Sequence, residues 1–291
     1  MRVFSRSAFV AASGLAAASI LAATPAARAG QPAAPPAPAP TAADWRALDP
    51  ENTLVIETTK GRIVVEMRPD VAPEAVERIK TLTRRGLYDG RSFFRVIGDF
   101  MAQTGDPKDD GTGGSDLPDL PGKFNFRRGP ETSFTAQQSQ SGFETGFVGT
   151  MPVTSQASGL MLMTTDGKVT AVPRFCPGVG GMARATDPDT ANSQFFLMRQ
   201  MNANLEAKYS AWGRVVTGLD VVRAIAVGEP PVNPDHMTRA RIAADIPAAE
   251  RPNIRVLDTA SAAFKAQVDA TRIARGADFT ICDVQVPVQG G

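Results

Sequence analysis

The sequence predicts a mainly β fold, and three observations support this prediction. β-Branched residues are frequent in residues 53–56 and 62–67, on either side of the turn signal Lys60-Gly61, which is typical of a β-hairpin. Apolar and polar residues alternate over residues 240–246, which predicts a closing strand. Between residues 45 and 247, helical periodicity marks two segments, one from Pro73 to about Gly86 and one over 219–225.

The first 44 residues are expected to lie outside the folded domain. Residues 1–29 have the pattern of a secretory signal peptide, with Arg2 and Arg6, then an apolar run, then the small-x-small site Ala27-Arg28-Ala29. Residues 30–44 are rich in Pro and Ala, as in a semi-extended linker. We therefore expect a periplasmic or secreted protein whose folded part begins near Trp45.

Composition excludes several classes of function. The net charge of +1 becomes −2 without the three arginines of the predicted leader, and no basic patch indicates nucleic acid binding. After the leader, no apolar run is long enough to span a bilayer. The single histidine, His236, excludes a multi-histidine metal site, and residues 111–115 lack the Gly-Lys-Ser/Thr ending of a phosphate loop. No metal and no cofactor are expected.

Residues 95–106, Arg-Val-Ile-Gly-Asp-Phe-Met-Ala-Gln-Thr-Gly-Asp, contain the strongest site candidate. The pattern predicts a strand, an irregular segment and a second strand, closed by the turn residues Gly105-Asp106-Pro107. Arg95 supplies a planar donor, Phe100 and Met101 an apolar surface, and Gln103 an amide. This mixture is typical of a binding cleft.

The same stretch resembles the central motif of the cyclophilin family of peptidyl-prolyl isomerases. Two further blocks follow in the order found in that family, residues 178–197 and residues 205–215. The resemblance covers about residues 50–247 and is interrupted by an insertion at about 116–175. It implies an eight-stranded antiparallel barrel capped by two α-helices over residues 45–247.

The resemblance also implies the activity, a cis-trans isomerisation of X-Pro bonds in proline-containing polypeptides that needs no cofactor. It makes Arg95 the catalytic donor to the prolyl nitrogen. Apolar side chains would wall a proline pocket, while amides, main-chain groups and a tyrosine would form its rim. A monomer is expected. The residues expected to bind substrate are Phe100, Met101, Gln103, Gly111, Ala183, Arg184, Ala185, Gln194, Phe196, Leu205 and Tyr209.

Alternatives remain open at this point. The same barrel can serve as a catalytically weak proline-peptide-binding chaperone or as a scaffold. Arg95 can instead form a surface ion pair, and the two glutamines can instead satisfy backbone groups. Gly98-Asp99 and Asn204 depart from the family pattern, which leaves the turnover rate open.

The two additions to the family pattern are less well determined. In the insertion, residues 160–165 and 168–172 flank Asp166-Gly167 as in a hairpin, 143–153 suggests one strand, and 135–142 suggests a flexible loop tip. The insertion can be a lid, a partner surface or padding.

The C-terminal extension, 248–291, is expected to pack on the barrel. It contains a predicted strand at 253–257, a helix at 261–275 and a strand at 279–288, although part of it can be the closing strand of the barrel itself. Cys176 and Cys282 are the only cysteines. An exported chain with an even number of cysteines favours a disulfide, with two buried free thiols as the alternative.

Overall fold

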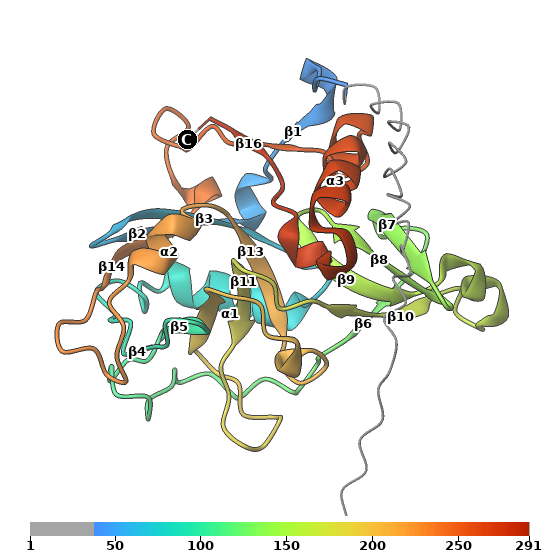
Figure 1. Cartoon of the computed structure of the whole chain (residues 1–291). Coiled ribbons are helices and arrows are strands. Elements are labelled where there is room, and N and C mark those ends of the chain that lie inside the picture. The colour runs from blue at the N-terminus through green and yellow to red at the C-terminus, as the bar shows by residue number, and fades with distance from the viewer. Residues whose placement is uncertain (1–37, 291) are drawn as a thin grey trace, which may run out of the picture. The chain divides into compact units, whose positions relative to one another are not determined.

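The computed structural model describes residues 38–290 (Figure 1). The predicted signal peptide, 1–29, and the predicted linker up to residue 37 lie outside the described residues. The barrel begins, as expected, with a hairpin of β2 (Thr53–Thr58) and β3 (Gly61–Met67), in which Thr58 pairs with Gly61. Gly61 has a φ of +132°, a backbone conformation that residues other than glycine rarely adopt.

Eight antiparallel strands form one curled sheet, which confirms the predicted fold class. Their order is β14-β2-β3-β13-β11-β12-β5-β4. Isolated bridges between Ser92 and His236 and between Val96 and Gly228 link the two ends of the sheet. The remaining strands are β4 (Arg95–Val96), β5 (Met101–Thr104), β11 (Val179–Met182), β12 (Phe195–Met198), β13 (Ala211–Thr217) and β14 (Met237–Ile242).

Two helices pack on the core of this sheet, as predicted. Helix α1 (Pro73–Arg84) has proline in its first turn and buries Val76, Ile79 and Leu82 on one face. Helix α2 (Leu219–Ala224) buries Val222 in the same core. The closing strand predicted at 240–246 lies earlier in the chain, because β14 begins at Met237 and ends at Ile242, and 243–245 form a 3₁₀ turn.

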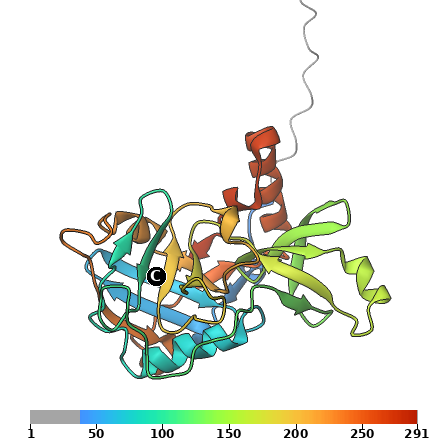
Figure 2. The ribbon, with the colours of Figure 1, turned by 90° about the horizontal axis from the view of Figure 1, so that it is seen from below.

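The insertion forms a second antiparallel sheet, which projects from one side of the barrel (Figures 1 and 2). Its strand order is β6-β10-β9-β8-β7. Within the described residues, none of its helical segments is longer than the 3₁₀ turn η3 (Ser158–Met163). The strands are β6 (Phe126–Arg128), β7 (Phe134–Gln140), β8 (Phe143–Val148), β9 (Met151–Gln156) and β10 (Val169–Pro173).

Three predictions within the insertion were wrong. The hairpin at Asp166-Gly167 does not form, because β10 pairs with β6 and β9 and leaves residues 160–165 without a partner strand. Residues 143–153 form two strands instead of one, since Gly149 turns the chain with a φ of +58°. Most of the polar segment 135–142 is strand β7, whose residues pair with β8 and expose their side chains to water.

The C-terminal extension packs beside the barrel but does not close it. Its three-stranded sheet has the order β1-β15-β16, built from β1 (Trp45–Ala47), β15 (Arg255–Leu257) and β16 (Val288–Gln289). Helix α3 (Ala262–Arg275) begins after Ser261, whose Oγ accepts from Phe264 N at 3.1 Å. The alternative that the extension supplies the closing strand was wrong, because β14 closes the sheet. The predicted strand 279–288 was also wrong, because residues 281–283 form the 3₁₀ turn η7 and pairing starts only at β16.

A disulfide and two buried charges attach both additions to the barrel. Cys176 and Cys282 form a disulfide, with Cα atoms 4.9 Å apart. The carboxylate of Glu66 (β3) accepts from Thr150 N at 3.0 Å and from Thr150 Oγ1 at 2.6 Å. The guanidinium of Arg214 (β13) donates to Thr150 O at 2.9 Å and to Val284 O at 3.1 Å. Insertion and extension are therefore held by the same pair of central strands.

The environments of these two buried groups differ. Burial by itself raises the pKa of Glu66, but the charges of Arg46 and Arg68 and the hydrogen bond from Thr150 outweigh it, so the pKa lies below its ordinary value. Burial lowers the pKa of Arg214 to about 10, which still leaves it charged at neutral pH.

Helices long and apolar enough to cross a membrane do not occur among residues 38–290.

Candidate functional site

One row of residues crosses four adjacent strands of the barrel and defines the site. Arg95 (β4) lies opposite Gln103 (β5), Gln103 lies opposite Phe196 (β12), and Phe196 lies opposite Gly181 (β11). Residues directly opposite each other on neighbouring strands share one face of a sheet. The register therefore brings a cation, an amide and an aromatic ring together on one face, although up to 101 positions separate them in the sequence.

Arg95 is held from two sides. Its Nε donates to Glu229 Oε2 at 2.7 Å, and its Nη1 donates to Gln103 Oε1 at 3.4 Å. The side chains of Arg95 and Glu229 are 40% and 50% exposed, so solvent screens this ion pair and it contributes little to stability. Within residues 38–290 the hydrogen bonds of this guanidinium use Nε and Nη1, so Nη2 can donate to a ligand. The ion pair considered as an alternative role is present, and it orients the guanidinium without covering it.

The two predicted glutamines form one chain of hydrogen bonds. Gln103 Nε2 donates to Gln194 Oε1 at 3.0 Å, and Gln194 Nε2 donates to the carbonyls of Gly111 at 3.1 Å and Gly113 at 2.8 Å. The contacts of Gln194 to backbone carbonyls match the alternative role considered for the glutamines, whereas the side chain of Gln103 is hydrogen-bonded to the side chains of Arg95 and Gln194. At its other end this chain of hydrogen bonds reaches Arg95. It therefore connects the loop at residues 111–113, which we call the rim loop, to the guanidinium.

Asp106 builds that rim loop and was missed as a site residue. Its fully buried carboxylate accepts from the backbone N–H groups of Lys108 at 2.8 Å, Gly111 at 2.5 Å and Gly113 at 3.2 Å. Gly111 has a φ of +89°, which favours glycine. The sequence pattern that could have predicted this role is an aspartate followed by several glycines, because an aspartate side chain can accept hydrogen bonds from the N–H groups of a tight loop.

The predicted apolar residues form one surface beside Arg95. Phe100, Met101, Phe196, Leu205 and Tyr209 belong to a single apolar cluster, in which Phe100 and Tyr209 are only partly buried. The rings of Phe196 and Tyr209 meet edge to face, with centroids 5.9 Å apart. A partly exposed apolar surface next to a free donor can bind a small apolar ring of a ligand. An amide attached to that ring can then accept a hydrogen bond from the guanidinium.

Two residues behind this surface were also missed. The ring of Phe175 lies 5.9 Å from that of Phe196. A Cβ atom on Gly181 would lie 2.5 Å from Phe196 Cζ and 2.8 Å from Phe175 Cε1, so only glycine leaves room for the observed ring positions. The motif Gly-Val-Gly-Gly at 178–181 was noted in the sequence, but its close packing depends on a partner 15 positions away.

The remaining predicted residues line a pocket of about 330 Å³ next to Arg95. It contains Gln103, Gly111, Gln194 and the segment 183–185. Arg184 is folded back over the ring of Tyr209, with its guanidinium carbon 4.4 Å from the ring centroid. Among residues 38–290, no group of three or more His, Cys, Asp or Glu side chains is placed to hold a metal ion. The fold and this site define a β-barrel protein with a partly apolar, partly polar cleft beside an arginine.

Comparisons with known proteins identify the family. Residues 53–243 match the family described as cyclophilin type peptidyl-prolyl cis-trans isomerase/CLD. A protein of Brucella suis described as a probable peptidyl-prolyl cis-trans isomerase is 35% identical over 215 residues, 68% of this chain and 86% of that protein. The crystal structure of a cyclophilin from Hirschia baltica matches with a TM-score of 0.77 and 35% identity, over 84% of this chain and 93% of that one. The chain therefore belongs to the cyclophilin-type peptidyl-prolyl cis-trans isomerases.

Proposed function

We propose that Arg95 is the catalytic donor of this isomerase. Rotation about an X-Pro bond has a barrier of about 20 kcal/mol, because the nitrogen lone pair is delocalised into the carbonyl. In the twisted amide the lone pair is localised on nitrogen, where a guanidinium N–H can donate to it. This interaction is stronger in the transition state than in the ground state, which is the condition for catalysis.

The observation that supports this role is the position of the guanidinium. Glu229 and Gln103 bind its Nε and Nη1. Met101 and Phe196 lie on the same face of the sheet as Gln103, in the apolar cluster that also contains Phe100. A proline ring on that surface, walled further by Leu205, brings its nitrogen toward the open side of the guanidinium. Arg95→Ala should therefore keep its fold and lose at least tenfold in kcat/KM on a short Ala-Pro peptide.

The other site residues position the polypeptide. In this proposal Gln103 and Gln194 bind substrate backbone, the main chain of residues 183–185 receives the residue before proline, and Gly111 and Tyr209 form the rim. The hydrogen bond from Ala183 N to Gln194 O, at 2.9 Å, supports a common orientation of these groups. The substrate is a proline-containing polypeptide, and the enzyme acts as a monomer without a cofactor.

The cellular role proposed is the folding of exported proteins in the periplasm or outside the cell. The leader pattern over residues 1–29 and the disulfide between Cys176 and Cys282 support it, since disulfides persist in oxidising compartments. In this proposal residues 30–44 are a linker that precedes the isomerase domain, 45–247, which is followed by the C-terminal extension, 248–291.

Fractionation of cells that produce the full chain tests this role. The expected result is a periplasmic or secreted protein whose mass corresponds to a chain that begins at Gly30, with no free thiol. The variant Ala29→Trp should accumulate as the uncleaved precursor. A cytoplasmic protein of full mass would contradict export, while its isomerase activity would be unaffected by that outcome.

A further inference from the structure

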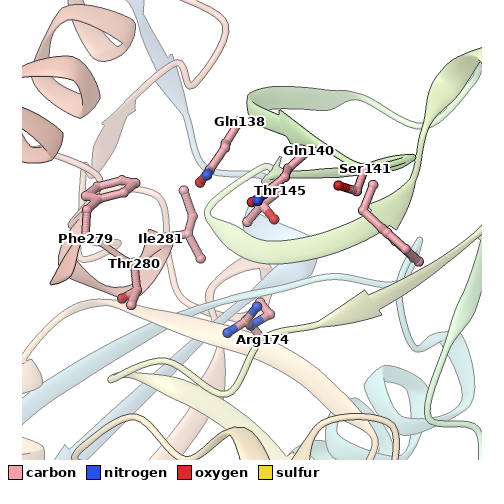
Figure 3. Close-up of a pocket in the computed structure, with 9 residues that line it drawn as sticks. Gln138, Gln140, Ser141, Thr145, Arg174, Phe279, Thr280 and Ile281 are labelled. Carbon is pink, nitrogen blue, oxygen red and sulfur yellow. The ribbon is translucent and has the colours of Figure 1, made fainter. Parts of the chain in front are cut away.

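A second pocket lies between the insertion and the C-terminal extension. It has a volume of about 430 Å³. Figure 3 shows glutamine side chains of the insertion on one side, the segment 279–281 on the other, and Arg174 below them in this view. We call it the distal groove. Its lining residues are Gln138, Gln140, Ser141, Phe143, Thr145, Arg174, Phe279, Thr280 and Ile281.

The wall from the insertion presents peptide-binding chemistry on one face of a hairpin. Gln138 pairs with Thr145 and Gln140 pairs with Phe143, so these four side chains share a face. Both glutamines are exposed, and each amide can donate to and accept from a peptide group. Phe143 is 53% exposed and offers an apolar ring beside them.

The charge of the distal groove indicates what it binds. Arg174 Nε lies 2.7 Å from Glu206 Oε1, so its charge is already compensated. Arg275, near the opposite wall, is paired with Asp283 at 3.2 Å. Amides, hydroxyls and aromatic rings without net charge suit an extended polypeptide with uncharged side chains, and they do not suit a phosphate or a nucleic acid.

The distal groove adjoins the proline pocket. Arg174 lines the groove, and the next residue, Phe175, packs on Phe196 in the wall of the proline pocket. The partner of Arg174, Glu206, directly follows Leu205, another residue of that wall. The two sites therefore share the backbone segments 174–175 and 205–206.

Both walls of the distal groove are fixed in advance. The disulfide joins Cys282, which follows Ile281 in one wall, to Cys176, which follows Phe175. The opposite wall is fixed through Gln137, next to Gln138: its Nε2 donates to Thr259 O at 3.2 Å, and its carbonyl accepts from Arg272 Nη2 at 2.8 Å. A ligand that enters a preformed groove does not have to order it, and this favours affinity.

We propose that the distal groove binds an extended, uncharged segment of the same polypeptide whose X-Pro bond occupies the proline pocket. The proposal rests on the isomerase activity at Arg95 and adds a substrate subsite built from the insertion and the extension. An extended chain advances about 3.3–3.6 Å per residue, so a spacer of about five residues spans roughly 17 Å. The enzyme should therefore prefer long, unfolded clients over short peptides.

The test compares a tetrapeptide that contains one Ala-Pro bond with peptides of about 16 residues. Each long peptide carries the same core, extended at either its N-terminal or its C-terminal end by a five-residue spacer and one further segment. That segment consists of Gln, Ser, Thr and Phe in the uncharged peptides and of Lys and Glu in the charged ones. Isomerisation is measured by NMR exchange, and affinity by calorimetry. The full mature chain should bind at least one long uncharged peptide about tenfold more tightly than the tetrapeptide, and the charged extension should give no such gain.

Variants separate the subsite from the catalytic site. The double variant Gln138→Ala, Gln140→Ala should bind the long peptide within about twofold of the tetrapeptide, while Ser139→Ala, on the other face of β7, should retain the tenfold preference. Arg95→Ala should lose isomerisation of both peptides but keep the preference for the long one. Equal affinity of the wild type for both lengths, or a preference that survives the double variant, overturns the subsite. Loss of the preference in Arg95→Ala alone would instead assign it to the proline pocket.

Discussion

Removal of the disulfide between Cys176 and Cys282 is expected to destabilise the protein while sparing the proline pocket. The two cysteines are 106 positions apart, and their cross-link joins the end of the insertion to the extension. Cys176 is fully buried and Cys282 is 7% exposed, both within the apolar cluster. The double variant Cys176→Ala, Cys282→Ala removes the bond and leaves small apolar groups in place.

The magnitude follows from the length of the closed loop. In the chain-entropy model, removal of a bond that closes a loop of 106 residues lowers the free energy of unfolding by about 4.8 kcal/mol at 25 °C. Residual contacts in the unfolded chain reduce this effect, so a loss of about 3–5 kcal/mol is expected. The extension keeps other contacts, including the hydrogen bond from Arg214 to Val284 O, and should remain docked in the native state.

Denaturant unfolding of the oxidised wild type, the reduced wild type and the double variant measures the effect. Reduction and the double variant should give the same lower midpoint, and kcat/KM for a short Ala-Pro peptide should stay within about threefold of the oxidised enzyme. An unfolding free energy within about 1 kcal/mol of the oxidised protein would refute the stabilising role. A large fall in short-peptide activity would show that the bond supports the catalytic pocket directly.

Three further substitutions test the site and its support. Gly181→Ala should displace the ring of Phe196, because the new Cβ would lie 2.5 Å from it, and lower kcat/KM at least fivefold. The same overpacking of buried rings should cost about 1–3 kcal/mol of unfolding free energy. Asp106→Asn should release the loop at Gly111 and raise KM severalfold, since the buried carboxylate accepts several N–H groups there; an unchanged KM would contradict this. Glu66→Gln should cost about 3 kcal/mol at pH 7. Because the native pKa of Glu66 is lowered, that difference should persist above the ordinary pKa and disappear as pH falls through the native value, as unfolding curves from pH 7 to pH 3 would show.

The first elements of the barrel could be predicted from sequence because their signals are local, whereas most of the candidate site residues were implied by the resemblance to cyclophilins. β-Branched residues on either side of Lys60-Gly61 specify the first hairpin, and Pro73 marks the start of the first helix. The motif around Arg95 and Gln103 occupies two strands joined by a short loop, so its spacing already implied that these residues are neighbours.

The parts that could not be predicted depend on distant partners. Strand β7 is polar along most of its length, and only its pairing with β8 makes it a strand. Glu229 orients Arg95 from 134 positions away, and nothing local distinguishes it from other exposed acids. Segment 160–165 has the composition of a strand but remains exposed, with Leu162 93% exposed, because both edges of β10 are already paired.

The kcat/KM of Arg95→Ala on a short Ala-Pro peptide, measured without a coupling protease, tests the central claim most directly. The exposed ion pair with Glu229 contributes little to stability, so the variant should unfold at nearly the wild-type midpoint. Its kcat/KM should fall at least tenfold, which corresponds to about 1.4 kcal/mol of transition-state stabilisation. Activity within twofold of the wild type in a correctly folded variant would contradict the assignment of Arg95 as the catalytic donor.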